Sequence, residues 1–238
     1  MAETYYKWHS IFQRGYGAVG MSFLNQDLRA LFLLVSIVVL FVLTPFLEND
    51  QWGELCLVLI MYSTLVAATM TLSGRRILFW GAIPMAGASM VLILADHFYK
   101  TQPLLIADRL LLVAFFGLVS VGLFTYLGRT GQITSGRLYV SVSLYFLLVL
   151  GWFALYTFLN AIQPGSFAES GATLTGRIAP SKILYFSLAT LTTLGYGDII
   201  PVRPAARMFA SLEAAAGVLY IAITVARLVA AYQRTTHE

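Results

Sequence analysis

The chain has 238 residues, of which 59% are hydrophobic and 11% are charged. Soluble domains carry about 25% charged residues, so a soluble globule of this composition would expose more apolar surface than such proteins tolerate. The single cysteine, Cys56, excludes a disulfide-built secreted domain, and the net charge of +4 is spread along the chain without the basic stripe expected for nucleic-acid binding.

Residues 1–28 precede the first long apolar run and do not resemble a cleavable signal, because they lack a short basic region followed by a short apolar one. Two interpretations stay open for this segment: it lies at the lipid surface, or it is an unstructured tail. The lipid-surface interpretation depends on the aromatic and apolar side chains Tyr5, Tyr6, Trp8, Ile11 and Phe12.

Six apolar runs follow, each close to the roughly 20 residues that a helix needs to cross a bilayer. They cover residues 30–47, 55–72, 77–95, 104–127, 138–162 and 205–232. The breaks between the first five, at 48–50, 73–76, 96–103 and 128–136, are rich in residues typical of loops. The sequence therefore predicts an all-α integral membrane protein with six transmembrane helices.

Basic residues predict the orientation of these helices. With the amino terminus inside, the cytoplasmic segments carry Lys7, Arg14, Arg29, Arg75, Arg76, Arg129, Arg137 and Arg234, and the first two outer loops carry only Lys100. This distribution agrees with the positive-inside rule, so we expect a multi-pass cell-membrane protein with both termini cytoplasmic. Acidic residues fall on or near the outer side: Glu48, Asp50, Glu54, Asp96, Asp108, Glu169 and Asp198.

The segment between the fifth and sixth runs does not fit a plain helix bundle. Residues 180–190 predict a helix of about 12 residues, which at 1.5 Å per residue is roughly 18 Å long and too short to cross the bilayer. A polar, glycine-containing run at 192–198 follows, and Pro201 and Pro204 precede the last span. A half-length helix with an irregular return is typical of a re-entrant loop, which is stable at membrane depth only where protein buries it or it lines a watery path.

The sequence Thr193–Leu194–Gly195–Tyr196–Gly197–Asp198 closely resembles the selectivity filter of potassium channels, whose usual form is Thr-Val-Gly-Tyr-Gly-Asp, and the resemblance extends over about residues 181–225. It implies that K⁺ binds at residues 193–197, through backbone carbonyls and the Thr193 hydroxyl, and that Gly197 and Asp198 shape the outer mouth. Carbonyls that replace an ion's water shell must point at one axis, and Gly195 and Gly197 can adopt the left-handed backbone that this requires.

One filter strand per chain cannot enclose an ion, so the resemblance implies a homotetramer around a central pore, embedded in lipid. The implied activity is passive K⁺ conduction, without enzyme chemistry and without a cofactor beyond the permeant ion. Residues 137–232 would form the pore domain, and residues 29–128 a four-helix bundle. Gly15–Tyr16–Gly17 repeats the filter tripeptide without a preceding pore helix, and we interpret it as an ordinary turn or flexible segment.

Several residues are expected to support the filter. Tyr185 and Phe186 supply aromatic mass behind it, and Thr192 and Asp198 flank it. Ala189 occupies a site where some relatives place a glutamate that pairs with the filter aspartate, so that brace is absent here.

An acid in a membrane helix is a functional candidate by default, and Glu213 lies in the last span. Three roles stay open for it: a hydrogen bond behind the filter near Thr190 or Thr192, a position facing the cavity, or an ion pair with a residue such as Arg207. Gly217, four residues later, is a candidate gating hinge or a site of close helix packing.

The four leading runs resemble, in number and position, the sensor bundle of voltage-gated channels. A voltage sensor needs several arginines, because each charge moved supplies only about 2.3 kcal/mol per 100 mV. The fourth run contains only Arg109, next to Asp108, so we expect an interfacial ion pair near the outer headgroups and no steep voltage gating. Only a few residues follow the last run, and we expect no cytosolic ligand-binding domain there.

Three other functions are alternatives to K⁺ conduction. Gly195–Tyr196–Gly197–Asp198 also matches the Gly-x-Gly-Asp pattern of intramembrane aspartyl proteases, but these need a second aspartate on a facing helix, typically after a tyrosine, and the chain has no Tyr-Asp pair. A subunit of a potassium transporter is an alternative, although single-chain transporters of that kind resemble four fused repeats. A non-conducting scaffold with an inactive filter is the third.

Overall fold

The computed structural model describes residues 26–48, 51–72, 76–99, 101–128 and 135–235. The N-terminal segment and its Gly15–Tyr16–Gly17 tripeptide lie outside these residues. The described elements are α2 (Gln26–Leu47), α3 (Gln51–Thr71), α4 (Arg76–Tyr99), α5 (Gln102–Leu127), α6 (Ser135–Ile162), β1 (Phe167–Glu169), β2 (Ala172–Leu174), α7 (Pro180–Leu191), β3 (Ile199–Pro201) and α8 (Pro204–Thr235).

The helices are long because their sequences are apolar on all sides, and several begin where a proline fixes the first turn. Proline stands in the first turn of α5 and α7, and Pro204 is the first residue of α8. Its missing N–H costs nothing there, since the first N–H groups of a helix have no partner within the helix. Each predicted span coincides with one helix, and the ends differ by only a few residues.

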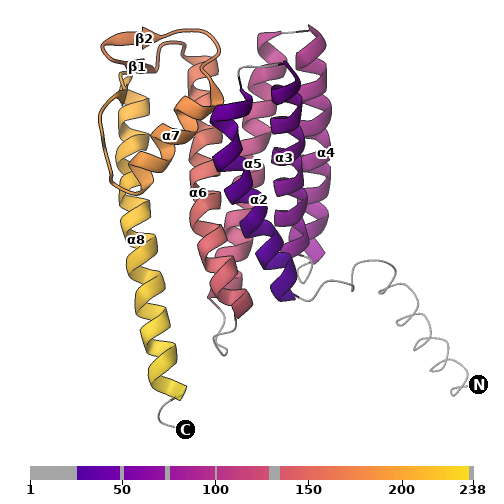
Figure 1. Ribbon diagram of the computed structural model, residues 1–238, viewed down its shortest axis with the longest axis vertical. Helices are drawn as coiled ribbons and strands as arrows, with labels where there is room; N and C mark the ends of the chain where they lie inside the picture. Colours follow the sequence, from indigo (N-terminus) through magenta and orange to yellow (C-terminus); the bar gives the residue numbers. More distant parts are fainter. Residues whose placement is uncertain (1–25, 49–50, 73–75, 100, 129–134, 236–238) are drawn as a thin grey trace, which may run out of the picture.

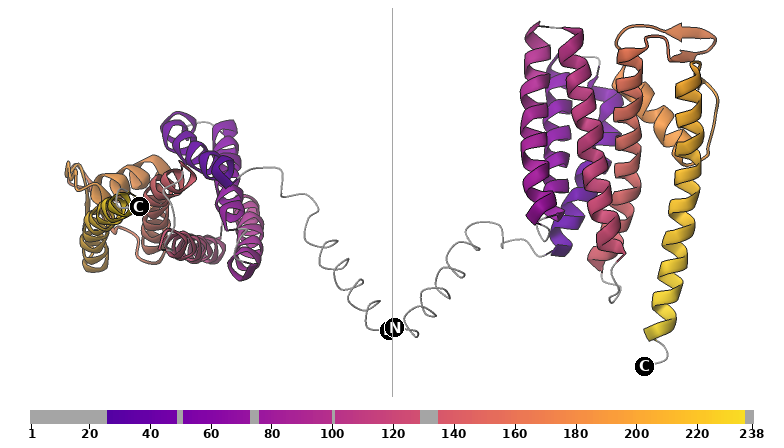
Figure 2. Two further views of the ribbon diagram at one scale, coloured as in Figure 1. Left: turned by 90° about the horizontal axis from the view of Figure 1, so that it is seen from below. Right: turned by 180° about the vertical axis from the view of Figure 1, so that it is seen from behind.

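Helices α2, α3, α4 and α5, called the amino-terminal bundle here, pack side by side and lean against α6 (Figures 1 and 2). Both α2 and α5 contact α6. The core between them contains Leu33, Ile37, Leu112, Phe115 and Leu144, each at most 1% exposed.

Five of the described helices, α2, α4, α5, α6 and α8, are long and apolar enough to cross a membrane. Within α3 the corresponding apolar stretch is shorter, Cys56–Thr71. The protein is therefore an all-α integral membrane protein, as predicted, and the sixth span at α3 stays a prediction. The start of α2 and the end of α8 lie at the end of the molecule opposite the small sheet (Figure 1).

A three-stranded antiparallel sheet, in the order β2-β1-β3, was not foreseen from the sequence. Phe167 pairs with Leu174 on one side and with Pro201 on the other. A tight turn with Ser170 at φ 48° and Gly171 at φ 84° connects β1 to β2. Because β1 precedes α7 and β3 follows the 192–198 segment, the sheet fixes both ends of the re-entrant loop.

The predicted ion pair between Asp108 and Arg109 is present, but Asp108 is buried inside the bundle and has further partners. Asp108 is 1% exposed and accepts a hydrogen bond of 2.7 Å from Ser89 of α4, whose hydroxyl also lies 3.1 Å from that of Tyr62. The Arg109 guanidinium lies 3.5 Å from the Asp108 carboxylate. Asp108 is buried because it shares a helix face with Leu112, four residues later, and that face packs inside the bundle.

Candidate functional site

The re-entrant loop lies between α6 and α8, where α7 crosses obliquely from the sheet toward the middle of α8 (Figure 1). Helix α7 has 12 residues, as predicted, and buries Ile183, Leu184, Phe186, Ser187 and Leu191. Its contacts are with α6, α8 and β3, and also with α2 of the amino-terminal bundle. The helix is therefore held on several sides.

The segment after α7 folds back onto the helix end through its own backbone N–H groups. Thr193 donates to the carbonyl of Thr190 at 3.0 Å, and Leu194 and Gly195 donate to the carbonyl of Ala189 at 2.8 and 3.3 Å. These bonds satisfy carbonyls that a helix end leaves without a partner. These bonds occupy the N–H groups of residues 193–195 but not their carbonyls, which are left to contact another partner such as an ion.

The backbone of this segment alternates in handedness. Thr193, Gly195 and Gly197 have φ of 58°, 57° and 79°, whereas Leu194 and Tyr196 between them are not in the positive-φ region. Such alternation turns successive carbonyls toward the same side, the arrangement that replaces the water shell of an ion. The left-handed backbone predicted for Gly195 and Gly197 is present. Thr193 also has a left-handed backbone, which the sequence did not predict because a β-branched residue rarely adopts it.

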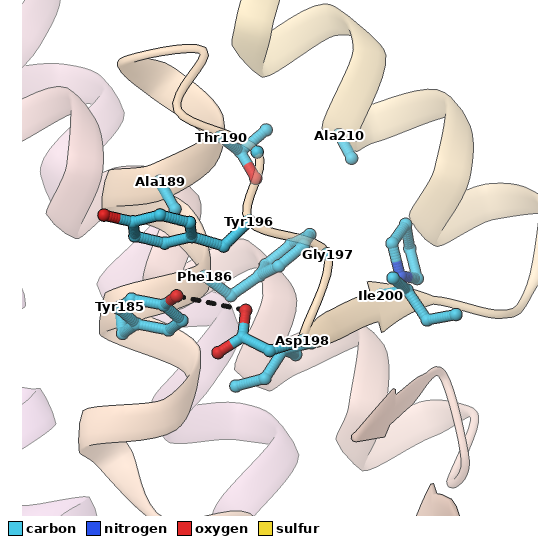
Figure 3. Close-up of a pocket in the computed structure, with 12 residues that line it drawn as sticks. Tyr185, Phe186, Ala189, Thr190, Tyr196, Gly197, Asp198, Ile200 and Ala210 are labelled. Carbon is cyan, nitrogen blue, oxygen red and sulfur yellow. Dashed lines mark hydrogen bonds between the residues drawn. The ribbon is translucent and has the colours of Figure 1, made fainter. Parts of the chain in front are cut away.

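The whole 192–198 segment is exposed on this single chain, including 55% of Leu194 and 70% of Tyr196. The second half of this segment, residues 195–198, lines a cavity of about 200 Å³ together with residues of α7, β3 and α8 (Figure 3). Across this cavity the Tyr185 hydroxyl donates a hydrogen bond of 3.0 Å to Asp198 (Figure 3). Tyr185 and Asp198, both predicted as support, are thus brought together.

Phe186 also lines this cavity and belongs to an aromatic cluster that joins α7 to neighbouring elements. Its ring centroid lies 5.2 Å from those of both Tyr156 and Phe167, which are 5.5 Å from each other. These rings come from α6, β1 and α7, and edge-to-face pairs at such distances are favourable. The cluster fastens α7 to α6 and to the sheet.

Glu213 contacts α7 at a place that sequence reasoning missed. Its carboxylate is fully buried and lies 2.6 Å from the hydroxyls of both Ser187 and Tyr156. Thr192 instead donates to Leu188 O at 2.7 Å, and Arg207 donates to Pro201 O at 3.2 Å. Glu213 thus braces the pore-loop helix about one turn before its end.

Of the three roles predicted for Glu213, the hydrogen bond to the pore-loop region agrees with this geometry, with Ser187 and Tyr156 as the donors. The predicted ion pair with a residue such as Arg207 is not formed, because Arg207 donates to Pro201 O. Its complete burial also excludes a position facing an open cavity in this chain. The sequence signal that could have indicated this contact was Ser187, a polar residue inside a helix too short to cross the membrane.

Gly217 lies where the backbone of α8 approaches the end of α7. A Cβ at this position would overlap the carbonyl oxygen of Leu191, so only glycine permits the approach. The Tyr145 hydroxyl lies 3.4 Å from the same carbonyl. Close packing, one of the two predicted roles of Gly217, is present, and the hinge stays a prediction.

Comparison with known proteins gives a family match in this same part of the chain, and also similarity to curated relatives. Residues 142–234 match a family model described as ion channel. The A-type voltage-gated potassium channel KCND3 of Rattus norvegicus, Homo sapiens and Mus musculus is 33% identical over 72 residues, which are 30% of this chain and 11% of the relative. No solved structure matches the chain.

The chain matches only 11% of the length of these relatives. The family match covers the elements that form the candidate site, because it begins in α6 and runs through the re-entrant loop into α8. These matches support the resemblance to potassium channels over part of the chain, in a membrane protein of the predicted fold class.

Proposed function

We propose that this protein is a potassium-selective channel that conducts K⁺ passively through a homotetrameric pore in the cell membrane. The observation that carries the proposal is the alternation of positive φ at Thr193, Gly195 and Gly197, directly after a helix too short to cross the membrane. No enzyme chemistry and no cofactor beyond the permeant ion enter the proposal.

The ion sites are the carbonyls of residues 193–197, together with the Thr193 hydroxyl. Their N–H groups from 193 to 195 are already bonded to α7, which supports a pore-facing orientation of the carbonyls. The carboxyl end of α7 carries the negative end of the helix dipole, which favours a cation near it. An ion of the right size then exchanges water for carbonyl oxygen at little cost.

The exposure of the filter segment supports assembly from four copies. A single chain offers one strand of carbonyls, and it leaves Leu194 and Tyr196 more than half exposed. Helix α8 also exposes apolar side chains along its length: Met208, Leu212, Val218, Leu219, Ile221, Ile223 and Val225. Neighbouring subunits and lipid would cover these surfaces.

The remaining expectations enter the proposal unchanged. Residues 137–232 form the pore domain and residues 29–128 a four-helix bundle packed against it, the sheet end faces outward, and both termini are cytoplasmic. Arg109 is bound to Asp108 in α5, which supports weak voltage dependence, although the relatives matched above are named voltage-gated. Gly217 remains the candidate gating hinge.

Ion flux from liposomes tests the proposal. Purified protein should release K⁺ much faster than Na⁺, without ATP, and Ba²⁺ should block the flux. Gly195→Ala should abolish the K⁺ flux because a φ of 57° is strained for alanine. Gly15→Ala, in the Gly-Tyr-Gly tripeptide near the amino terminus, is the matched control. Equal K⁺ and Na⁺ flux would contradict selectivity, and absent flux from an intact tetramer would favour the scaffold.

The alternatives have less support. An aspartyl protease needs two aspartates that share a proton, whereas Asp198 is bound by Tyr185, Asp96 by Arg177 and Asp108 by Ser89. A transporter subunit would need a partner protein or an energy source to move K⁺. Flux by the purified chain alone would argue against it.

A further inference from the structure

Two acidic side chains of the amino-terminal bundle reach the part of the chain that contains α7. Glu48, directly after α2, accepts hydrogen bonds from the backbone N–H and the hydroxyl of Ser181 at 2.9 and 2.5 Å. Asp96, near the end of α4, has its two carboxylate oxygens 3.0 and 2.8 Å from Nη2 of Arg177. The two residues of the first contact are 133 positions apart in the sequence, and those of the second are 81 positions apart.

Helix α7 cannot cap its own amino-terminal end. Its N-cap residue is Ala179, which makes no side-chain cap hydrogen bond, and Pro180 has no N–H to donate. The N–H of Ser181 is therefore the first free donor of the helix, and it needs an acceptor from elsewhere. Glu48 provides that acceptor, and its negative charge stands at the positive end of the helix dipole.

The position of this short helix determines the position of the filter segment. The carbonyls of Ala189 and Thr190 at its far end hold the N–H groups of residues 193–195. With only 12 residues, α7 has about two and a half turns between the Glu48 contact and these bonds. A displacement of its first turn is therefore transmitted to the filter with little loss.

We infer that the amino-terminal bundle is an outer brace of the pore helix and that Glu48 is the positioning residue through which it acts on ion selectivity. This inference rests on the proposed function. It gives the bundle a task that does not require the row of arginines of a voltage sensor. The ion pair between Asp96 and Arg177 is a second contact of this kind, which holds the loop before α7 against α4.

The test uses the full chain in liposomes and two measurements. Hydrogen exchange at residues 180–191 reports the cap itself, and the ratio of K⁺ to Na⁺ flux reports the filter. Glu48→Ala removes both bonds to Ser181, so exchange in the first turn should rise about fivefold, the factor expected from a lost cap. The flux ratio should fall about tenfold. Ser181→Ala, which removes only the hydroxyl, should give a smaller fall.

Two further variants separate bracing from other effects. Glu169→Gln removes the partner of Lys182 on the same turn of α7 and should leave both measurements unchanged. Ala179→Ser, added to Glu48→Ala, gives α7 a cap of its own, so exchange should return to the wild-type rate while the flux ratio stays low.

A wild-type flux ratio in Glu48→Ala, recovery of the ratio by Ala179→Ser, or an equal fall in Glu169→Gln would each overturn the inference. Failure of the proposed function looks different, because the unsubstituted protein would then show no K⁺ preference. The exchange measurement does not depend on conduction, and a wild-type exchange rate in Glu48→Ala would overturn the inference by itself.

Discussion

The hydroxyl of Ser187 lies 2.6 Å from the Glu213 carboxylate and 3.0 Å from the carbonyl of Val149. One polar residue of α7 is therefore shared between α8 and α6, in a region where Glu213 is fully buried. Buried polar groups that lose a partner in such surroundings are costly, since water cannot replace it. The stability of the pore domain should depend strongly on this contact.

Glu213→Ala should destabilise the folded protein by about 3 kcal/mol, because it leaves the buried Tyr156 hydroxyl without its partner, removes one of the two contacts of Ser187 and opens a cavity. Tyr156→Phe, which removes one of the two bonds, should cost about 1 kcal/mol. Thermal unfolding in detergent measures both, with Glu169→Gln, at a half-buried position outside this network, as the control. Equal midpoints for Glu213→Ala and the control would show that the network carries no stability.

Tyr185 and Asp198 should be energetically coupled. Tyr185→Phe removes the hydrogen bond of 3.0 Å across the cavity behind the filter, and Asp198→Asn weakens the same bond from the other side. A double-mutant cycle on Ba²⁺ block should give a coupling of about 0.5–1 kcal/mol. Strict additivity of the two single effects would mean that the bond does not hold the outer mouth.

The long helices could be predicted from the sequence because each is an uninterrupted apolar run, and the limits of the run indicate the limits of the helix. The pore-loop helix was predictable for the same reason, since its length was limited by Pro180 and the glycine-containing segment. The positive φ of Gly195 and Gly197 followed from what carbonyl alignment demands of a backbone. These features depend on residues close together in the chain.

Features that depend on distant residues could not be predicted. The partners of Glu213 lie 26 and 57 residues away, and Glu48 is 133 residues from Ser181. The strands of the sheet have three residues each, too few for an alternating pattern. The burial of Asp108 was missed because a helix that is apolar on all sides does not indicate which face packs inward.

Gly217→Ala should displace α7, since its methyl group would overlap the carbonyl oxygen of Leu191. We expect a loss of stability of about 1–3 kcal/mol, the usual cost of overpacking, together with reduced K⁺ flux. Gly87→Ala and Gly117→Ala are matched controls, because a Cβ at either helical position meets nothing within 4 Å. Normal stability with altered channel opening would favour the hinge role over close packing.

Arg109→Gln should leave the dependence of K⁺ current on voltage unchanged. Arg109 lies 3.5 Å from the buried Asp108 carboxylate, and a single charge crossing the whole field would supply only about 2.3 kcal/mol per 100 mV. Current recorded over a range of voltages from planar bilayers measures this. Asp108→Leu should in contrast lower stability by about 1–3 kcal/mol, because Ser89 loses its buried acceptor. A steep voltage dependence that Arg109→Gln removes would show that α5 moves as a sensor despite having one arginine.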